Sequence, residues 1–272
     1  MVKKAQSLNT RNGCRLAYEI TGEGVPLILI HGWTLNRELW SSQVPEFSQY
    51  YKTIIYDRRG YGESDGKPDL RKDMDDLNDL LNHLAIDSCY ILGMSQGGRV
   101  ALRYSITHPD RVKALILQCS HLDGYVPKAN EKDQVPLTHY SNLAKQGQID
   151  TVRDEWMNHP LMHIPTSNLA LKKQVREIIN CYSGEDLTDD MTERMAYPIN
   201  ISENLQQITI PTLIIEGSEE TAMLKDVANK LHDSIYGSKK IVITGGGHLI
   251  NLIEPEKYNR AVIDFLQSLN HI

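Results

Sequence analysis

The chain has 272 residues, a formal net charge of -6 at pH 7 and a mean hydropathy of -0.39. An acidic chain without a basic stripe interleaved with aromatic residues is not typical of nucleic-acid-binding proteins. Its apolar runs are also far shorter than the ~20 residues that cross a bilayer. We therefore expect neither a nucleic-acid partner nor a membrane span, and the length suits one large domain with an insertion.

The N-terminus and the cysteines bear on the location of the protein. Residues 1–7 carry charge, but no apolar stretch follows them as it would in a standard secretory signal. The four cysteines show no C-x-x-C spacing, and Cys89 and Cys119 fall within expected strands, which is typical of small buried residues. Reduced thiols favour a cytoplasmic location.

Apolar runs and helical spacings alternate along the chain. The runs predict strands at residues 12–20, 25–31, 52–57, 88–93, 113–119, 211–216 and 239–244. The helical spacing predicts helices at residues 70–84, 96–106, 222–232 and 254–268. Alternating units of this kind predict an α/β fold with a mostly parallel sheet and helices on both faces.

A candidate nucleophile, Ser95, stands where one expected strand meets a helix. The apolar run 89–92 leads into GMSQG at residues 93–97, and G-x-S-x-G in a strand–turn–helix setting is the turn that presents a serine nucleophile. Gly93 and Gly97 relieve the crowding of such a tight turn. The alternative is a glycine-rich connection without chemistry, so the motif needs its context.

Candidate partners for Ser95 lie near the C-terminus. A hydroxyl becomes a good nucleophile when a base removes its proton and a third group orients that base. His248 follows a glycine run after the expected strand 239–244, so it lies on a loop beyond a strand end. The expected strand 211–216 runs into GSEE at residues 217–220 and supplies a carboxylate. The chain order is therefore serine, acid, histidine.

A further requirement is a site for the negative oxygen of a tetrahedral intermediate, which needs two backbone N–H donors. One donor comes from the residue after the nucleophile, here Gln96, and the other from a loop after an early strand. The stretch LILIHGW at residues 27–33 places Trp33 in such a loop.

With the segment DRRGYGESD at 57–65, these motifs closely resemble the α/β-hydrolase superfamily over residues 12–121 and 209–270. The resemblance implies that Trp33 and Gln96 form the oxyanion hole. It also favours a structural role for the segment 57–65, in which an arginine ties neighbouring loops and glycines permit a sharp turn, over a reactive cluster of acids.

The resemblance also implies a domain organisation. Residues 1–121 and 209–272 form the α/β-hydrolase core, a mostly parallel sheet flanked by helices. The alternation of strands and helices breaks between residues 122 and 208, which contain helical pieces such as 166–181 but no strand series. Lying between two sheet strands, this stretch matches the helical cap that the family inserts over its active site.

The resemblance assigns the acid and the base as well. The family's histidine matches His248, and its acid stands three residues after the glycine that ends its strand, which here is Gly217, so the acid is Glu220. A glutamate replaces the usual aspartate, and the adjacent Glu219 is an alternative. Some members place the acid after the preceding strand, where Asp123 is a further alternative.

The expected cap contains aromatic residues that suit a substrate wall, and we assign Tyr140, Trp156 and Tyr182 to that wall. His159 and His163 have the i, i+4 spacing of metal ligands, but Pro160 interrupts a helix there and no H-E-x-x-H is present. We therefore expect no metal and no cofactor.

The charge of the expected cap bears on the substrate. Residues 122–208 contain 8 Lys and Arg against 13 Asp and Glu. An anionic substrate usually requires a clustered basic site, and no cluster stands out, although one well-placed residue such as Arg153 or Arg194 would be enough. The composition disfavours dicarboxylate lactones as substrates.

The sequence therefore predicts a cofactor-free serine hydrolase that acts on a small or medium carboxylic ester, a small-molecule substrate. Ser95 attacks the carbonyl, His248 takes its proton and Glu220 stabilises the imidazolium. The N–H groups of Trp33 and Gln96 hold the oxyanion, and water then releases the acid.

Other functions stay open. The stretches 31–35 and 56–60 look like the cofactor-free haloperoxidase branch and its esterase relatives, so perhydrolase or haloperoxidase-type chemistry, lactone hydrolysis and carbon–carbon bond hydrolysis are alternatives. Ser95 disfavours the haloalkane dehalogenase and epoxide hydrolase branches, which use an aspartate nucleophile. A ligand-binding member of the fold without enzymatic activity is the alternative from a different class.

Overall fold

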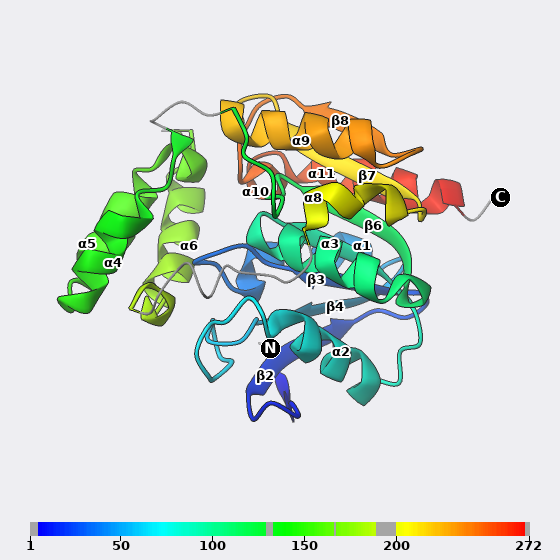
Figure 1. The fold of residues 1–272 in the computed structure, drawn as a ribbon, viewed down its shortest axis with the longest axis horizontal. Coiled ribbons are helices and arrows are strands. Elements are labelled where there is room, and N and C mark those ends of the chain that lie inside the picture. Colours follow the sequence, from blue (N-terminus) through cyan, green and yellow to red (C-terminus); the bar gives the residue numbers. More distant parts are fainter. Residues whose placement is uncertain (1–4, 129–132, 166, 189–199, 270–272) are drawn as a thin grey trace.

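The computed structural model describes residues 5–128, 133–165, 167–188 and 200–269. Its centre is an eight-stranded sheet in the order β1-β2-β4-β3-β5-β6-β7-β8 (Figure 1). The strands are β1 (Gln6–Asn9), β2 (Arg15–Thr21), β3 (Pro26–Ile30), β4 (Lys52–Tyr56), β5 (Cys89–Met94), β6 (Val112–Gln118), β7 (Thr212–Gly217) and β8 (Lys239–Ile243). β2 pairs antiparallel with β1 and with β4, and the other neighbours are parallel. The predicted α/β fold with a mostly parallel sheet is confirmed.

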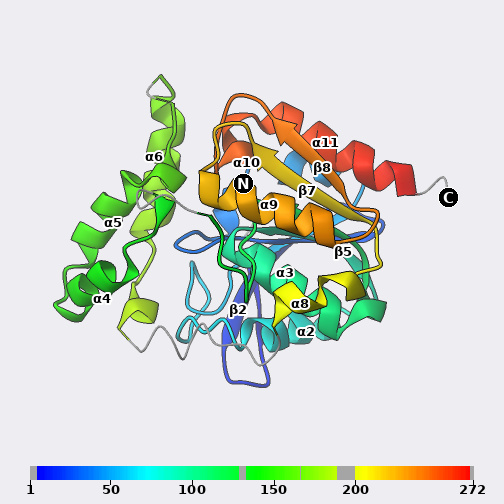
Figure 2. The same ribbon diagram turned by 45° about the horizontal axis from the view of Figure 1, so that its top comes forward.

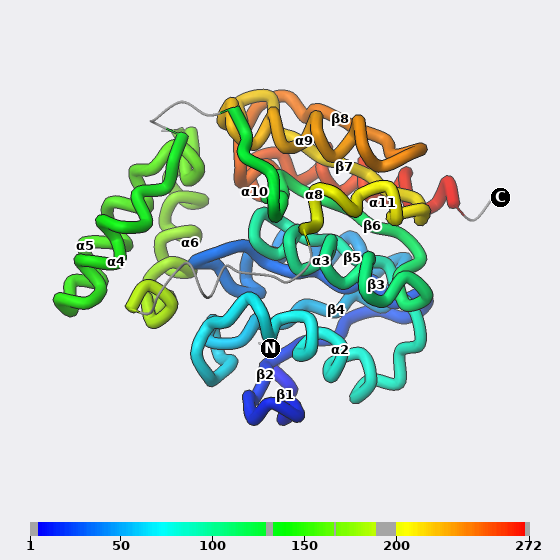
Figure 3. The backbone as a smooth tube through the Cα atoms, in the orientation of Figure 1, coloured from blue at the N-terminus to red at the C-terminus, as the bar shows by residue number. Residues whose placement is uncertain are grey.

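The strand β1 was not predicted. It is a short edge strand of which only Leu8 is buried, so it has no apolar run to reveal it. It forms a hairpin with β2 at one end of the sheet, whereas β8 forms the other end (Figure 3). The prediction of a strand from residue 12 is wrong, because residues 11–13 form the hairpin turn, with Gly13 at φ 71°.

Helices cover both faces of the sheet (Figures 1 and 2). One face carries α2 (Asp73–His83), α3 (Gln96–Thr107) and α9 (Ala222–Ser234). The other carries α1 (Val44–Phe47) and α11 (Pro255–Ser268), which contact each other, and α11 directly follows α10 (Ile250–Ile253). The helices predicted at 70–84, 96–106, 222–232 and 254–268 are thus present.

A second group of helices lies beside the body that contains the sheet (Figures 1 and 2). It consists of α4 (Leu137–Lys145), α5 (Ile149–Met157), the short helix η4 (Pro160–Met162), α6 (Leu169–Asn180) and the short helix η5 (Glu185–Leu187). We call these five elements the cap helices. Among them, α4 contacts α5 and η5, and α5 contacts α6, which also contacts the short helix η1 (Arg37–Trp40) of the core.

The chain returns to the core before β7. The short elements α8 (Ile201–Asn204) and η6 (Leu205–Gln207) contact α3 and α9, respectively, rather than the cap helices. The segment between β6 and β7 therefore has two parts. Its first part forms the cap helices, and its last described part packs on the helices that cover the sheet.

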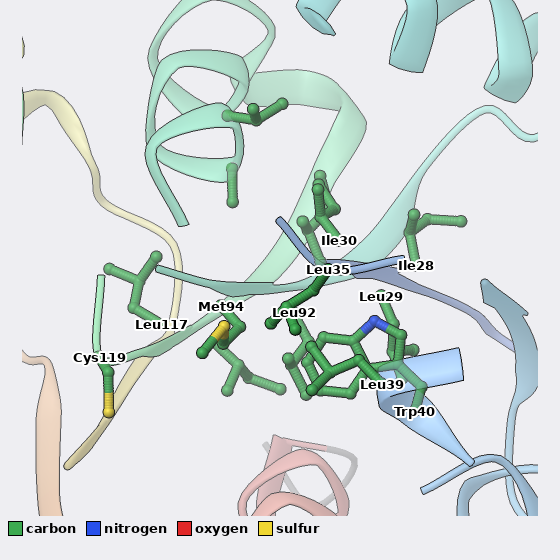
Figure 4. Packing of buried hydrophobic residues seen from close by; sticks show 14 of the residues in the cluster. Ile28, Leu29, Ile30, Leu35, Leu39, Trp40, Leu92, Met94, Leu117 and Cys119 are labelled. Carbon is green, nitrogen blue, oxygen red and sulfur yellow. The ribbon is translucent and has the colours of Figure 1, made fainter. Parts of the chain in front are cut away.

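The middle of the sheet is buried on both faces. All residues of β5 are buried, as the continuous apolar run requires. In β3, Ile28 and Ile30 point to one side and Leu29 to the other, towards Trp40 (Figure 4). This packing fixes the positions of the strands whose ends carry the residues of the candidate active site.

Four parallel strands end at the same edge of the sheet. The register pairs Ile30 with Gly93, Gly93 with Leu117, and Gln118 with Ile215, so the loops after β3, β5, β6 and β7 leave side by side, where ligands of open α/β sheets bind. Among the described residues, no helix has both the length and the apolar character needed to span a membrane.

Candidate active site

Ser95 occupies the sharp turn between β5 and α3. Its backbone has φ 55° and ψ -116°, a strained conformation for a residue with a side chain. A Cβ atom at Gly93 would collide with the carbonyl oxygen of Gly97, and one at Gly97 would collide with that of Ile30. The turn therefore requires both glycines, and the predicted strand–turn–helix geometry is present.

Glu220 contacts His248, which lines the same cavity as Ser95. Glu220 Oε2 lies 2.7 Å from His248 Nδ1, and both side chains are buried. The amide of Thr221 donates to Glu220 Oε1 over 2.7 Å. Burial by itself raises the pKa of Glu220, but the charge and hydrogen bond of His248 and the Thr221 amide outweigh burial, so that the net shift is downwards. A carboxylate at this position favours the imidazole with its proton on Nδ1, which leaves Nε2 to accept a proton.

The structure separates Glu220 from the two alternative acids. Glu219 is exposed, and its amide donates to the carbonyl of Gly246 over 2.9 Å. Asp123 is held by two arginines, by a short contact to Arg99 and by a 2.7 Å bond from Arg103 Nε. Of the three predicted candidates, Glu220 is the one that contacts His248.

The loop after β3 is held by the segment 57–65. The ring of His31 is buried and accepts a hydrogen bond from the amide of Arg58 at Nε2 over 2.9 Å. Burial and the positive charge of Arg58 lower the pKa of His31 well below its usual value, so the ring is neutral. The Arg58 side chain also donates to Gln96 Oε1 over 2.8 Å and to Asp73. These contacts give the segment a structural role in ordering both loops of the predicted oxyanion hole.

A cavity of about 110 Å³ opens above these groups. It is lined by residues of the core and of the cap helices: Gly32, Trp33, Leu35, Met94, Ser95, Gln96, Arg99, His121, Val135, Leu137, Trp156, Leu161, Met162 and His248. Ser95, His248, Trp33 and Gln96 thus share one cavity. An open groove between cap helices and the loop 219–222 adjoins it, and Met162 lines both.

The three aromatic residues predicted to line a substrate wall are placed differently. Trp156 lines the cavity. Tyr182 is buried behind Trp33, with ring centroids 5.7 Å apart, and its hydroxyl donates to Asp186. Tyr140 is buried within α4, and neither tyrosine is among the residues that line the cavity. Aromatic content alone does not show which side of a helix faces the site.

Two functional candidates were missed in the sequence, Arg99 and His121. Arg99 lies one helical turn after Ser95 on α3, and this i, i+4 spacing could have revealed it. Burial and the neighbouring charges of Arg99 and His248 lower the pKa of His121 to about 3, so its ring is neutral. Of the two arginines considered from the sequence, Arg153 binds the carbonyl of Tyr182, and Arg194 lies outside the described residues.

The histidine pair of the cap does not form a joint site. His159 Nδ1 accepts from the amide of Leu161 over 3.2 Å, and His163 is exposed. Cys119, Glu220 and His248 bring a sulfur, an oxygen and a nitrogen atom within 4.8 Å of one another. Burial and the negative charge of Glu220 raise the pKa of Cys119 well above its usual value, and Glu220 and His248 are already in contact with each other.

Comparisons with known proteins identify the family and the fold of the chain. Residues 25–255 match the family model described as alpha/beta hydrolase fold. The chain is 27% identical to a non-heme chloroperoxidase of Kitasatospora aureofaciens, covering 94% of this chain and 98% of the relative. It is also 27% identical to a 2-hydroxy-6-oxo-6-(2'-aminophenyl)hexa-2,4-dienoic acid hydrolase of Metapseudomonas resinovorans, covering 93% and 88%.

Solved structures share the fold. A thermophilic esterase from Thermogutta terrifontis superimposes with a TM-score of 0.82 at 24% identity, covering 97% of this chain and 98% of the other. The enol-lactonase from Burkholderia xenovorans LB400 superimposes with a TM-score of 0.80 at 18% identity, covering 96% and 100%. The names of these relatives span several reactions, so they leave the bond that is cleaved open.

Proposed function

The chain belongs to the alpha/beta hydrolase fold family, and on this premise we propose that it is a serine esterase that cleaves small carboxylic esters through Ser95, His248 and Glu220. The observation that carries the proposal is the buried 2.7 Å contact between Glu220 and His248 at the cavity that Ser95 also lines. A hydrolase activity follows from the family, and the ester substrate and the roles of these residues are our proposal.

The proposed reaction proceeds in two halves. His248 Nε2 takes the proton of Ser95 as Oγ forms a bond to the ester carbonyl, and the carbonyl oxygen becomes an oxyanion. The carbon–oxygen bond to the alcohol then breaks, and His248 returns the proton to the leaving alcohol. In the second half His248 deprotonates water, which attacks the acyl group. The bond between the acyl carbon and Ser95 Oγ then breaks, and His248 returns the proton to Oγ as the carboxylic acid leaves. Glu220 keeps its negative charge and stabilises the imidazolium in each half.

The oxyanion is held by the amides of Trp33 and Gln96 in this proposal. Gln96 is the first residue of α3, and the first N–H groups of a helix have no acceptor within that helix. The positive end of the helix dipole adds to their effect on an anion. The second amide comes from the loop after β3, which the contacts of His31 and Arg58 hold in place.

The dimensions of the cavity support a small acyl group. Its volume of about 110 Å³ is below the roughly 300 Å³ at which pockets for drug-sized ligands begin. Its cap side is formed by apolar residues, among them Leu137, Leu161 and Met162.

A second candidate is a hydrolase for substrates that carry a carboxylate. The observation that favours it is Arg99, which lines the cavity while it is paired with Asp123, because a positive charge at the wall attracts a carboxylate. A relative named as a dienoic acid hydrolase is consistent with it. Lactone hydrolysis and perhydrolysis would use the same serine, and no feature of the cavity favours them over esters.

The test is a panel of p-nitrophenyl esters with neutral acyl chains of increasing length, beside hemiesters that end in a carboxylate. We expect the highest kcat/KM for short neutral chains, and a preference for the hemiesters would favour the second candidate. An organophosphonate should label Ser95, as mapped by mass spectrometry of the peptide. Absence of turnover across the panel, or a label on another residue, would contradict the proposal.

A further inference from the structure

Two hydrogen bonds join the cap helices to the loop that carries the proposed oxyanion donor. We call residues 31–36 the oxyanion loop. Its Trp33 donates to Asp186 in η5, and its Thr34 accepts from Trp156 in α5. One indole donor belongs to the core and the other to the cap, so each side supplies one donor and one acceptor.

The first bond fixes the side chain of Trp33. Trp33 Nε1 donates to Asp186 Oδ2 over 2.7 Å, and the other oxygen of this buried carboxylate accepts from the hydroxyl of Tyr182. Hydrogen bonds to a charged acceptor are stronger than neutral ones. The residue whose amide is the proposed oxyanion donor is therefore held from the cap.

The second bond acts on the next residue of the loop. Thr34 has φ 62°, in the left-handed region that a β-branched residue rarely adopts. Such a conformation persists only where the surroundings hold it. Trp156 Nε1 donates to Thr34 Oγ1 over 2.8 Å, and both residues are buried. The bond from the cap therefore supports the strained part of the loop.

Aromatic packing reinforces the two bonds. The ring centroids of Trp33 and Trp156 lie 4.9 Å apart in an edge-to-face arrangement, and Tyr182 packs against the same indole. The partners of the two hydrogen bonds are 153 and 122 residues apart in the chain. A shift of the cap helices thus moves Trp33 and Thr34 directly.

We propose that Asp186 and Trp156 are positioning residues through which the cap sets the geometry of the oxyanion loop. The inference rests on the proposed function, since it takes the Trp33 amide as an oxyanion donor. Loss of one such donor lowers kcat by about 10²- to 10³-fold, and a misplacement of 1 Å can cost about 10²-fold. The cap therefore completes the catalytic site in addition to enclosing the substrate.

The test compares Asp186→Asn and Trp156→Phe with the wild-type protein and with Ser141→Ala. Ser141 Oγ donates to the carbonyl of Leu187 over 2.6 Å, so this control removes a buried bond of the cap next to Asp186 without touching the oxyanion loop. We expect kcat to fall about 10- to 100-fold in both test variants. KM should stay within about threefold in Asp186→Asn, since Asp186 does not line the cavity whereas Trp156 does. The affinity for a trifluoromethyl ketone, which forms a tetrahedral oxyanion, should fall by the same factor as kcat. The control should keep both values.

Two further measurements separate positioning from a general loss of structure. Asp186→Asn takes the charge from the acceptor of the bond that Trp33→Phe removes, so adding Asp186→Asn to Trp33→Phe should lower kcat no further. Hydrogen exchange of the amides in residues 32–36 should accelerate in Asp186→Asn and Trp156→Phe but not in Ser141→Ala.

The outcomes distinguish this inference from the proposed function. If the wild-type protein cleaves esters and both test variants retain the wild-type kcat and the wild-type exchange rates of the loop, the inference is overturned and the function stands. If the wild-type protein cleaves no ester, the function fails, and the exchange measurement alone then decides whether the cap holds the loop.

Discussion

The two sides of the cavity are built in different ways. On the sheet side, Ser95 and His248 follow strands whose register is fixed by neighbouring buried strands. On the cap side, Trp156, Leu161 and Met162 come from short helices that meet the core through side-chain contacts. The comparison indicates that the proposed reacting groups are anchored at the ends of hydrogen-bonded strands, while the cap side of the cavity depends on how the cap helices are held.

Substitution of the nucleophile should give the largest effect on the sheet side. We expect Ser95→Ala to lower kcat by about 10⁵- to 10⁶-fold, the scale seen when a serine of a triad is removed. The side chain is small, so thermal unfolding should be unchanged. Stopped-flow and end-point assays of ester hydrolysis measure the rate, and calorimetry measures the unfolding temperature. A loss below about tenfold would contradict the assignment of the nucleophile.

Substitution of the proposed triad acid, Glu220, should give the next largest loss of kcat. We expect Glu220→Gln to lower kcat by about 10³- to 10⁴-fold, because the amide favours the wrong tautomer of His248 while keeping the shape of the side chain. Glu219→Gln is the matched control, since it makes the same change on the adjacent exposed residue, and it should stay within about twofold. If the control loses more activity than Glu220→Gln, Glu219 is the acid.

The difference between the sheet side and the cap side also explains which features of the structure could be predicted from the sequence. Strands buried on both faces are continuous apolar runs, and each motif follows such a run, so the fold and the positions of Ser95 and His248 could be predicted. Glu220 could be selected only through the family's spacing, and its contact with His248 required the structure. The edge strand β1 could not be predicted, because it buries a single side chain, Leu8.

The cap residues that line the cavity could not be predicted from the sequence, for a physical reason. Its helices are amphipathic, and a helical spacing shows that one side is buried without showing whether that side faces the cavity or another helix. Tyr140 and Trp156 are therefore equivalent in the sequence, although only Trp156 lines the cavity. The hydrogen bond between Trp33 and Asp186 joins residues 153 positions apart, so no local sequence pattern predicts it.

On the sheet side, the ion pairs of Asp123 are expected to contribute to the free energy of unfolding and not to catalysis. Burial raises the pKa of Asp123, but Arg99 and Arg103 outweigh burial and the net shift is downwards. Asp123→Asn leaves two guanidinium groups without this carboxylate, so we expect a loss of about 3 kcal/mol in the free energy of unfolding at pH 7.

The pH dependence of that loss has a defined sign. A lowered pKa means that the ionised carboxylate favours the folded state, so its contribution is present above its ordinary pKa of about 4 and is lost as pH falls through the lower folded value. The difference between wild type and Asp123→Asn should therefore be largest near pH 7 and shrink below about pH 4. Denaturant unfolding at both pH values measures it, and a difference that grows on acidification would contradict the assigned sign.

The smallest effect is expected on the cap side, where Met162 lines both the cavity and the adjoining groove. Met162→Ala should open a passage between them and shift the preference towards longer acyl chains. Each methylene that gains a buried position contributes about 0.8 kcal/mol, which corresponds to roughly fourfold in kcat/KM per methylene. The measurement is kcat/KM for p-nitrophenyl acetate, butyrate and hexanoate. Ile178→Ala is the matched control, because Ile178 is buried in α6 and does not line the cavity. If both variants shift the preference equally, the change reflects a loosened cap and not the wall at Met162.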